Sequence, residues 1–113
     1  MRELIKSSSL NPVMTIRPLL GTISKPLAAA MLLRHGDKLR VFEDKGMFYI
    51  AKTDANGYTV NKAGTNGTSY TISTRRIYEV TGRDMTLVYT GIIKDINGLK
   101  AYELKPYEDA VQD

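Results

Sequence analysis

The chain has 113 residues, of which 42% are hydrophobic and 25% charged, shares typical of an ordinary soluble globular domain. Cysteine is absent and His35 is the single histidine, which excludes a disulfide framework and a thiolate metal site and disfavours a zinc site. The formal net charge of +4 is compatible with nucleic acid without requiring it. No apolar run approaches the roughly 18 residues of a membrane span, so we expect a cytoplasmic protein.

The positive charge is spread over both halves of the chain. Up to Gly57 the sequence holds nine Lys and Arg against five Asp and Glu, and from Tyr58 onward it holds seven against seven. Three of the latter acids, Glu108, Asp109 and Asp113, lie close to the C-terminus. We therefore expect two mildly basic halves and an acidic C-terminal tail over residues 106–113.

The first half predicts two short strands followed by a short helix. Residues 14–24 read as two extended pieces separated by a Pro-Leu-Leu-Gly turn. Ser24 is a suitable N-cap for a helix over residues 25–34, and Gly36 is the expected stop of that helix.

The second half predicts the same elements in the same order. Residues 58–60 and 70–72 are extended on either side of a glycine-rich loop. Ser73 or Thr74 can then cap a helix over residues 74–81, and Gly82 ends it.

A hairpin closes each half. Residues 38–44 alternate between apolar and polar side chains, and the Lys-Gly pair at 45–46 turns the chain into a second strand. Residues 84–93 form a longer strand with a bulge expected at Gly91, and the Asn-Gly pair at 97–98 is a strong hairpin signal.

The two halves read as a tandem duplication. The same three residues, Thr-Ile-Ser, begin at Thr22 and at Thr71, which are 49 residues apart (71 − 22). Neither unit is large enough to bury its apolar face alone, so the two units should share one core. We predict a mainly β protein with two short helices, a β-barrel of the swapped-hairpin or double-psi type. It would consist of β-β-α-β-β repeats over residues 14–52 and 58–105, preceded by an N-terminal arm over residues 1–13.

The apolar periodicity predicts which side chains fill the barrel. In the second helix Ile77 and Val80 should point inward, which leaves Arg75, Arg76 and Glu79 exposed. The predicted core consists of Ile23, Leu27, Met31, Leu39, Val41, Ile50, Ile72, Ile77, Leu87 and Leu99.

Two short motifs carry a family resemblance. Ile-Ser-Lys-Pro-Leu at residues 23–27 begins the first helix, and His-Gly-Asp-Lys-Leu-Arg-Val at residues 35–41 follows it. In this order they resemble the AbrB/SpoVT-AbrB family, over residues 14–52 and more loosely over 58–105. The resemblance implies a barrel whose two halves come from one chain, and hence a monomer or a weak homo-oligomer. It also implies double-stranded DNA as a partner and a transcriptional regulator of the AbrB-like type.

The same resemblance implies which residues contact DNA. The family's arginines lie on the short helix and on the strand before it, whereas the first half of this chain has Ala28 and Ala29 at the matching helix positions. A guanidinium group pairs with phosphate oxygens or with a guanine edge. The alternative is that the arginines of the second helix are only its solvated face. The candidate nucleic-acid-binding residues are Arg75, Arg76, Arg83, Arg17 and Lys25.

Catalysis lacks the necessary residues. His35 is expected near the end of the first helix, and the sequence has neither a phosphate-binding loop nor an aspartic-protease signature. We predict a protein that is not an enzyme and has no cofactor or metal. The alternative to DNA binding is a non-catalytic structural or interaction module with a protein partner, for example a virion or assembly component.

Tyrosine is the main aromatic residue of the predicted strands, at Tyr49, Tyr58, Tyr70, Tyr89 and Tyr102. Exposed tyrosines could stack on the bases of single-stranded nucleic acid. Packing is the expected role, because tyrosine is favoured in strands for that reason.

Overall fold

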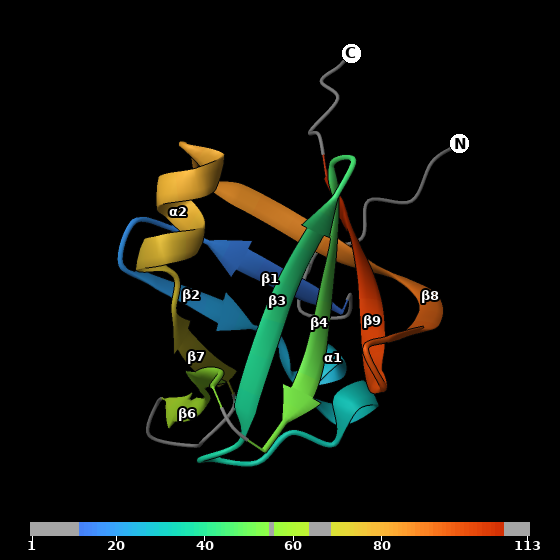
Figure 1. Ribbon diagram of the computed structural model, residues 1–113. Helices are drawn as coiled ribbons and strands as arrows, with labels where there is room; N and C mark the ends of the chain where they lie inside the picture. The colour runs from blue at the N-terminus through green and yellow to red at the C-terminus, as the bar shows by residue number, and fades with distance from the viewer. Residues whose placement is uncertain (1–11, 55, 64–68, 108–113) are drawn as a thin grey trace, which may run out of the picture.

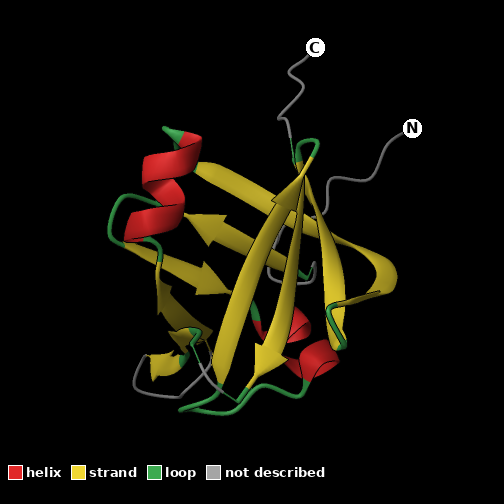
Figure 2. Cartoon of the chain, viewed as in Figure 1, coloured by secondary structure: helices red, strands yellow, loops and turns green. Residues whose placement is uncertain are grey.

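The computed structural model describes residues 12–54, 56–63 and 69–107 (Figures 1 and 2). The expected N-terminal arm up to residue 11, the centre of the glycine-rich loop and the acidic tail from residue 108 lie outside these ranges. In chain order the elements are β1 (Val13–Ile16), β2 (Leu20–Ile23), α1 (Lys25–Met31), β3 (Lys38–Asp44), β4 (Met47–Thr53), β5 (Tyr58–Thr59), β6 (Asn61–Ala63), β7 (Ser69–Ser73), α2 (Arg75–Thr81), β8 (Met85–Ile96) and β9 (Leu99–Pro106).

The strands form one antiparallel sheet that curls into a nearly closed barrel (Figure 1). Their order is β5-β3-β4-β9-β8-β1-β2-β7-β6. The two end strands, β5 and β6, are separated in sequence only by Val60. The N–H of Val60 donates to the Asp37 carbonyl at 2.7 Å, and its carbonyl accepts from the Gly36 N–H at 2.8 Å. The predicted fold class, a mainly β barrel with two short helices, is confirmed.

Strands from the two predicted units alternate in pairs around the barrel. β1 pairs with β8, β2 with β7, β3 with β5 and β4 with β9, so four of the strand pairings join one unit to the other. If β5 and β6 are counted as one strand that closes the sheet into a ring, this strand is the counterpart of β1, and β7, β8 and β9 are the counterparts of β2, β3 and β4. Exchanging each strand with its counterpart leaves the order around the ring unchanged. This is the order that two equivalent units would produce. The duplication itself stays a hypothesis, because strand order does not measure how well the units superpose.

Both predicted hairpins are confirmed. Lys45-Gly46 and Asn97-Gly98 each have two consecutive positive φ angles, 53° and 86° in the first turn and 54° and 83° in the second, as type I′ turns require. An acidic side chain accepts the glycine N–H in each turn, Glu43 at 2.9 Å and Asp95 at 3.0 Å. The predicted bulge is also present, because the β8–β9 register shifts between Tyr89 and Ile93, around Gly91 (φ 91°).

Helix α1 is shorter than predicted. Ser24 caps it as expected, since its Oγ accepts from the Leu27 N–H at 3.4 Å. The helix ends at Met31 because Leu32 adopts the left-handed conformation, with φ 57° and ψ 43°. Gly36 lies in the turn beyond and bonds to Val60, so the prediction that Gly36 stops the helix is wrong. Helix α2 ends at Gly82 (φ 73°), as predicted.

The barrel interior holds most of the predicted core. Val41 is half-buried against it, and the other predicted residues that are buried there are Ile23, Leu27, Met31, Leu39, Ile50, Ile72, Ile77 and Leu87. The strand tyrosines pack as predicted: Tyr102 is buried in this core, Tyr49 is buried in a second cluster, and Tyr58, Tyr70 and Tyr89 are half-buried against the core.

Leu99 is an error in the predicted core. It is half-buried in the second cluster, which forms around Tyr49, Ala51 and Ala101. On β4 these cluster residues alternate with the core residue Ile50, so the second cluster lies on the other face of the sheet. The prediction therefore placed Leu99, the first residue of β9, on the wrong face of the sheet.

Candidate nucleic-acid interface

Helix α2 presents the two arginines predicted at its start. Arg75 and Arg76 are both exposed. The buried side of α2 is formed by Thr74, the N-cap, by Ile77 and by half-buried Thr81, which recur at intervals of three and four residues. The arginines therefore lie on the side of the helix that faces away from the barrel.

The prediction that Val80 points inward is wrong, because its side chain is 81% exposed. At about 100° per residue, Val80 lies about 60° from Ile77 and still further from half-buried Tyr78 and Thr81. The buried side of α2 continues from Ile77 to Thr81, four residues later, and does not include Val80, three residues later. Val80 therefore lies at the edge of the exposed side.

Thr74 ties α2 to the turn between β1 and β2. Its side chain is fully buried, its N–H donates to the Leu19 carbonyl at 3.0 Å, and its hydroxyl donates to the Arg17 carbonyl. Gly21 permits this close approach, because a Cβ at that position would lie 2.5 Å from Thr74 Cγ2 and 2.2 Å from the Thr15 carbonyl oxygen. The backbone of Arg17 is thereby held beside α2.

Arg17 and Arg83 line one cavity of about 470 Å³. The pairing of Ile16 with Met85, at the ends of β1 and β8, brings the segment after β1 next to the segment before β8. The complete lining consists of Thr15, Ile16, Arg17, Arg83, Asp84, Met85, Thr86, Pro106 and Tyr107. Both arginines are exposed, and neither forms an ion pair with a described residue.

Tyr107 is a candidate that sequence reasoning missed. Its side chain is 59% exposed, and its N–H donates to the Thr86 carbonyl at 2.8 Å. It lines the cavity of Arg17 and Arg83 and also a second, open cavity of about 750 Å³, whose lining includes the β3–β4 turn, part of β8 and Lys105. One signal in the sequence could have identified it. Tyr107 follows the last predicted strand, so the packing of that strand would not bury its side chain.

Lys25 is not brought to this surface. It is exposed at the first position of α1, and α1 and α2 lie at well-separated places on the barrel (Figure 1). The structure therefore brings Arg17 together with Arg83 and leaves Lys25 apart.

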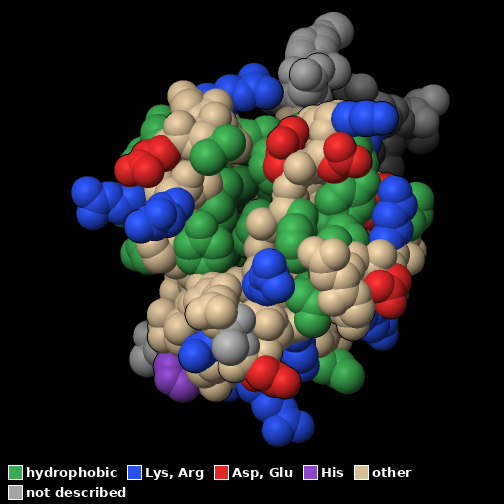
Figure 3. Space-filling view, viewed as in Figure 1, with side chains coloured by type: hydrophobic (Ala, Val, Ile, Leu, Met, Phe, Trp, Pro, Cys, Tyr) green, Lys and Arg blue, Asp and Glu red, His purple; other side chains and the backbone are tan. Residues whose placement is uncertain are grey.

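The surface beside α2 has mixed character (Figure 3). Basic side chains project from it, and an acidic side chain lies next to them. A hollow lined by hydrophobic side chains separates α2 from the β3–β4 hairpin. This hollow is a cavity of about 180 Å³ whose lining includes Phe42, Arg76, Ile77 and Val80.

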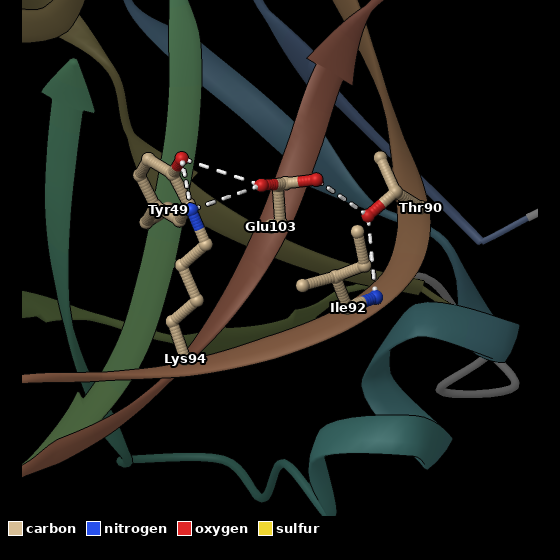
Figure 4. Close-up of polar contacts among 5 residues, drawn as sticks. All are labelled: Tyr49, Thr90, Ile92, Lys94 and Glu103. Atoms are coloured by element: carbon tan, nitrogen blue, oxygen red, sulfur yellow. Dashed lines mark hydrogen bonds and ion pairs between the residues drawn. The ribbon is translucent and has the colours of Figure 1, made fainter.

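A buried carboxylate lies on the outer face of the sheet (Figure 4). Glu103 is 7% exposed, and its two oxygens accept from the Tyr49 hydroxyl at 3.3 Å and from the Thr90 hydroxyl at 2.9 Å. Lys94 Nζ lies 3.7 Å from the same carboxylate and 3.4 Å from the Tyr49 hydroxyl. Because each polar group here has a partner, we interpret the cluster as structural.

The pKa of Lys94 is raised above its ordinary value of 10.5. The main cause is its hydrogen bond to the Tyr49 hydroxyl, and the negative charge of Glu103 adds to it. The ammonium group also lies 5.2 Å from the centre of the Tyr49 ring.

The position of His35 differs from the prediction. It follows α1 by several residues instead of ending it, and its Nδ1 accepts the N–H of Lys62 at 3.1 Å. Among the described residues no group of three His, Asp or Glu side chains could hold a metal ion. Neither described helix is long and apolar enough to cross a membrane.

Comparison with protein-family models, with curated proteins and with solved structures finds no match for this chain. The likeness to the AbrB/SpoVT-AbrB family therefore stays a hypothesis that rests on the sequence motifs alone.

Proposed function

We propose that the protein binds double-stranded DNA through the surface around α2, as a transcriptional regulator of the AbrB-like type that acts in the cytoplasm. One observation carries the proposal. Arg75 and Arg76 are exposed at the start of α2, Arg83 follows its end and lines a cavity with Arg17, and none of the four forms an ion pair with a described residue.

The length of α2 suits a DNA backbone. Seven helical residues span about 10 Å, and a DNA strand carries one phosphate per roughly 3.4 Å of helix axis. Arginines at both ends of α2 would therefore cover about three phosphates along the duplex axis. Each guanidinium group offers a planar fork of donors to phosphate oxygens.

Two acids reduce the positive potential of this surface. Glu79 is exposed on α2, and Asp84 lines the cavity with Arg17 and Arg83. Since these charges are exposed to solvent, we expect a modest affinity that falls steeply with salt.

The test is the double variant Arg75→Ala with Arg76→Ala, titrated against random duplex DNA at two salt concentrations. We expect binding to weaken by about tenfold or more and the salt dependence to flatten, because two phosphate contacts are lost. The melting temperature should stay nearly unchanged, since exposed charges contribute little to stability.

The matched control is Lys25→Ala with Lys100→Ala, which removes the same charge from exposed positions outside the α2 surface. It should weaken binding by less than about threefold. An equal loss in both double variants would show a general charge effect instead of a site. Unchanged binding of the arginine variant would move the site elsewhere.

A second function is favoured by the apolar part of the same surface. Val80 is 81% exposed beside the hollow that also contains Phe42 and Ile77. Exposed apolar side chains around a hollow are typical of protein contacts. A protein that shows no duplex binding even at low salt would therefore be better explained as an interaction module.

A further inference from the structure

We propose that the cavity between the β1–β2 turn and the α2–β8 connection binds a nucleoside monophosphate. This proposal does not require duplex binding. The ligand is either a free nucleotide or the phosphorylated terminal nucleotide of a single strand.

Backbone hydrogen bonds between strands hold two sides of the cavity in place. Thr15 and Ile16 of β1 pair with Thr86 and Met85 of β8. The N–H of Tyr107 then bonds to the Thr86 carbonyl at 2.8 Å, which holds the end of β9 against the same strand. Three segments distant in the sequence thus form one concave surface.

The size of the cavity points to a ligand larger than an inorganic ion. Its volume of about 470 Å³ lies in the range of small-molecule sites, roughly 300–1,000 Å³. A phosphate group alone would contact the arginines and leave most of this space to water. A nucleotide adds a sugar and a flat base of suitable size.

The lining supplies partners for each part of a nucleotide. Arg17 and Arg83 supply two guanidinium groups that form no ion pair with a described residue, and such groups suit a dianionic phosphate. The exposed ring of Tyr107 offers a face on which a base can stack. The Asp84 carboxylate can accept a hydrogen bond from a ribose hydroxyl or a base amino group.

The charge balance disfavours other ligand classes. Two arginines and one aspartate give the lining a net positive charge, so a metal cation would be repelled. The Thr15 hydroxyl already pairs with the Thr22 hydroxyl at 2.6 Å, so we do not assign it a contact with the ligand.

The test is a titration of the full-length protein with adenosine 5′-monophosphate, followed by amide chemical shifts. Adenosine and inorganic phosphate serve as the two partial ligands. We expect the monophosphate to bind about tenfold more tightly than either part, because only it uses the arginines and Tyr107 together. Shifts should concentrate at residues 15–17, 83–86 and 107.

Two variants assign the contacts. Arg17→Ala with Arg83→Ala should weaken monophosphate binding by about tenfold or more, and Tyr107→Ala should reduce it to the level of inorganic phosphate. Lys25→Ala with Lys100→Ala is the matched control, because it removes the same charge from exposed positions outside the cavity, and it should leave monophosphate binding unchanged. Circular dichroism of each variant checks that the barrel is folded.

Some outcomes overturn the proposal. These are equal binding of phosphate and monophosphate, equal loss in the control variant, or no binding of the monophosphate at millimolar concentration. Competition by a 5′-phosphorylated single-stranded oligonucleotide, but not by its unphosphorylated form, would identify a strand end as a source of the ligand. Competition by neither oligonucleotide would identify the free nucleotide. Duplex binding is measured separately, so either proposal can fail alone.

Discussion

At the scale of single residues, Leu39 shows how the strand alternation determines stability. It is fully buried in the barrel core and lies opposite Lys52 of β4 and Tyr58 of β5. Truncation to alanine would leave a cavity between strands that backbone hydrogen bonds hold in place.

We predict that Leu39→Ala lowers the free energy of unfolding by about 2–5 kcal/mol, measured by urea denaturation. Leu19→Ala is the control, because the Leu19 side chain is 67% exposed, and it should change stability by less than about 0.5 kcal/mol. Similar effects of the two substitutions would contradict the assigned core.

Lys94 gives a prediction about pH. Its pKa is raised in the folded protein, so its contribution to stability is fully present below the unfolded value of 10.5 and is lost as pH rises through the folded pKa. The variant Lys94→Met keeps most of the side-chain stem and removes the charge. We expect the difference in stability between wild type and variant to stay constant up to about pH 10 and to shrink above it. A difference that persists unchanged at higher pH would contradict this account, and urea melts across the alkaline range provide the measurement.

At the scale of elements, the two helices end with the same backbone conformation but different residues. Gly82 ends α2 with φ 73°, whereas Leu32 adopts φ 57° at the end of α1. A residue with a Cβ costs about 1–2 kcal/mol in this left-handed region, and glycine does not carry that cost.

We therefore predict opposite effects of two substitutions. Gly82→Ala should lower the free energy of unfolding by about 1 kcal/mol, because a Cβ there would meet no atom within 4 Å and the effect is purely conformational. Leu32→Gly should raise it by up to about 1 kcal/mol, since the greater entropy of unfolded glycine offsets part of the gain. Thermal melts of both variants check the prediction, and effects of the same sign would refute it.

At the scale of the whole molecule, the strand pairing makes each half depend on the other. β1, β2 and β4 of the first unit all pair with strands of the second. Neither half contains a closed sheet, so neither can cover its own apolar side chains.

We predict that fragments 1–57 and 58–113 do not fold as monomers and that an equimolar mixture recovers the barrel. Circular dichroism and size-exclusion chromatography would follow the recovery. A fragment that folds alone as a monomer would contradict the shared core, whereas a fragment that folds as a homodimer would support the duplication.

The sequence by itself determined the local structure. Alternation in residues 38–44, the turns at 45–46 and 97–98, the Ser24 cap and the bulge at Gly91 were all predicted correctly. These features follow from short-range physics: side chains alternate along a strand, and type I′ turns need residues that tolerate positive φ. The mainly β class and most of the core follow from the same local patterns.

Only the tertiary structure decided which segments meet. Arg17 and Arg83 share a cavity because β1 pairs with β8, and Lys25 is excluded because α1 lies elsewhere on the barrel. The exposure of Val80 and Tyr107 depends likewise on what covers each position. Periodicity fixes the face of an element on which a side chain lies, but the identity of its neighbours depends on long-range pairing that no local pattern encodes.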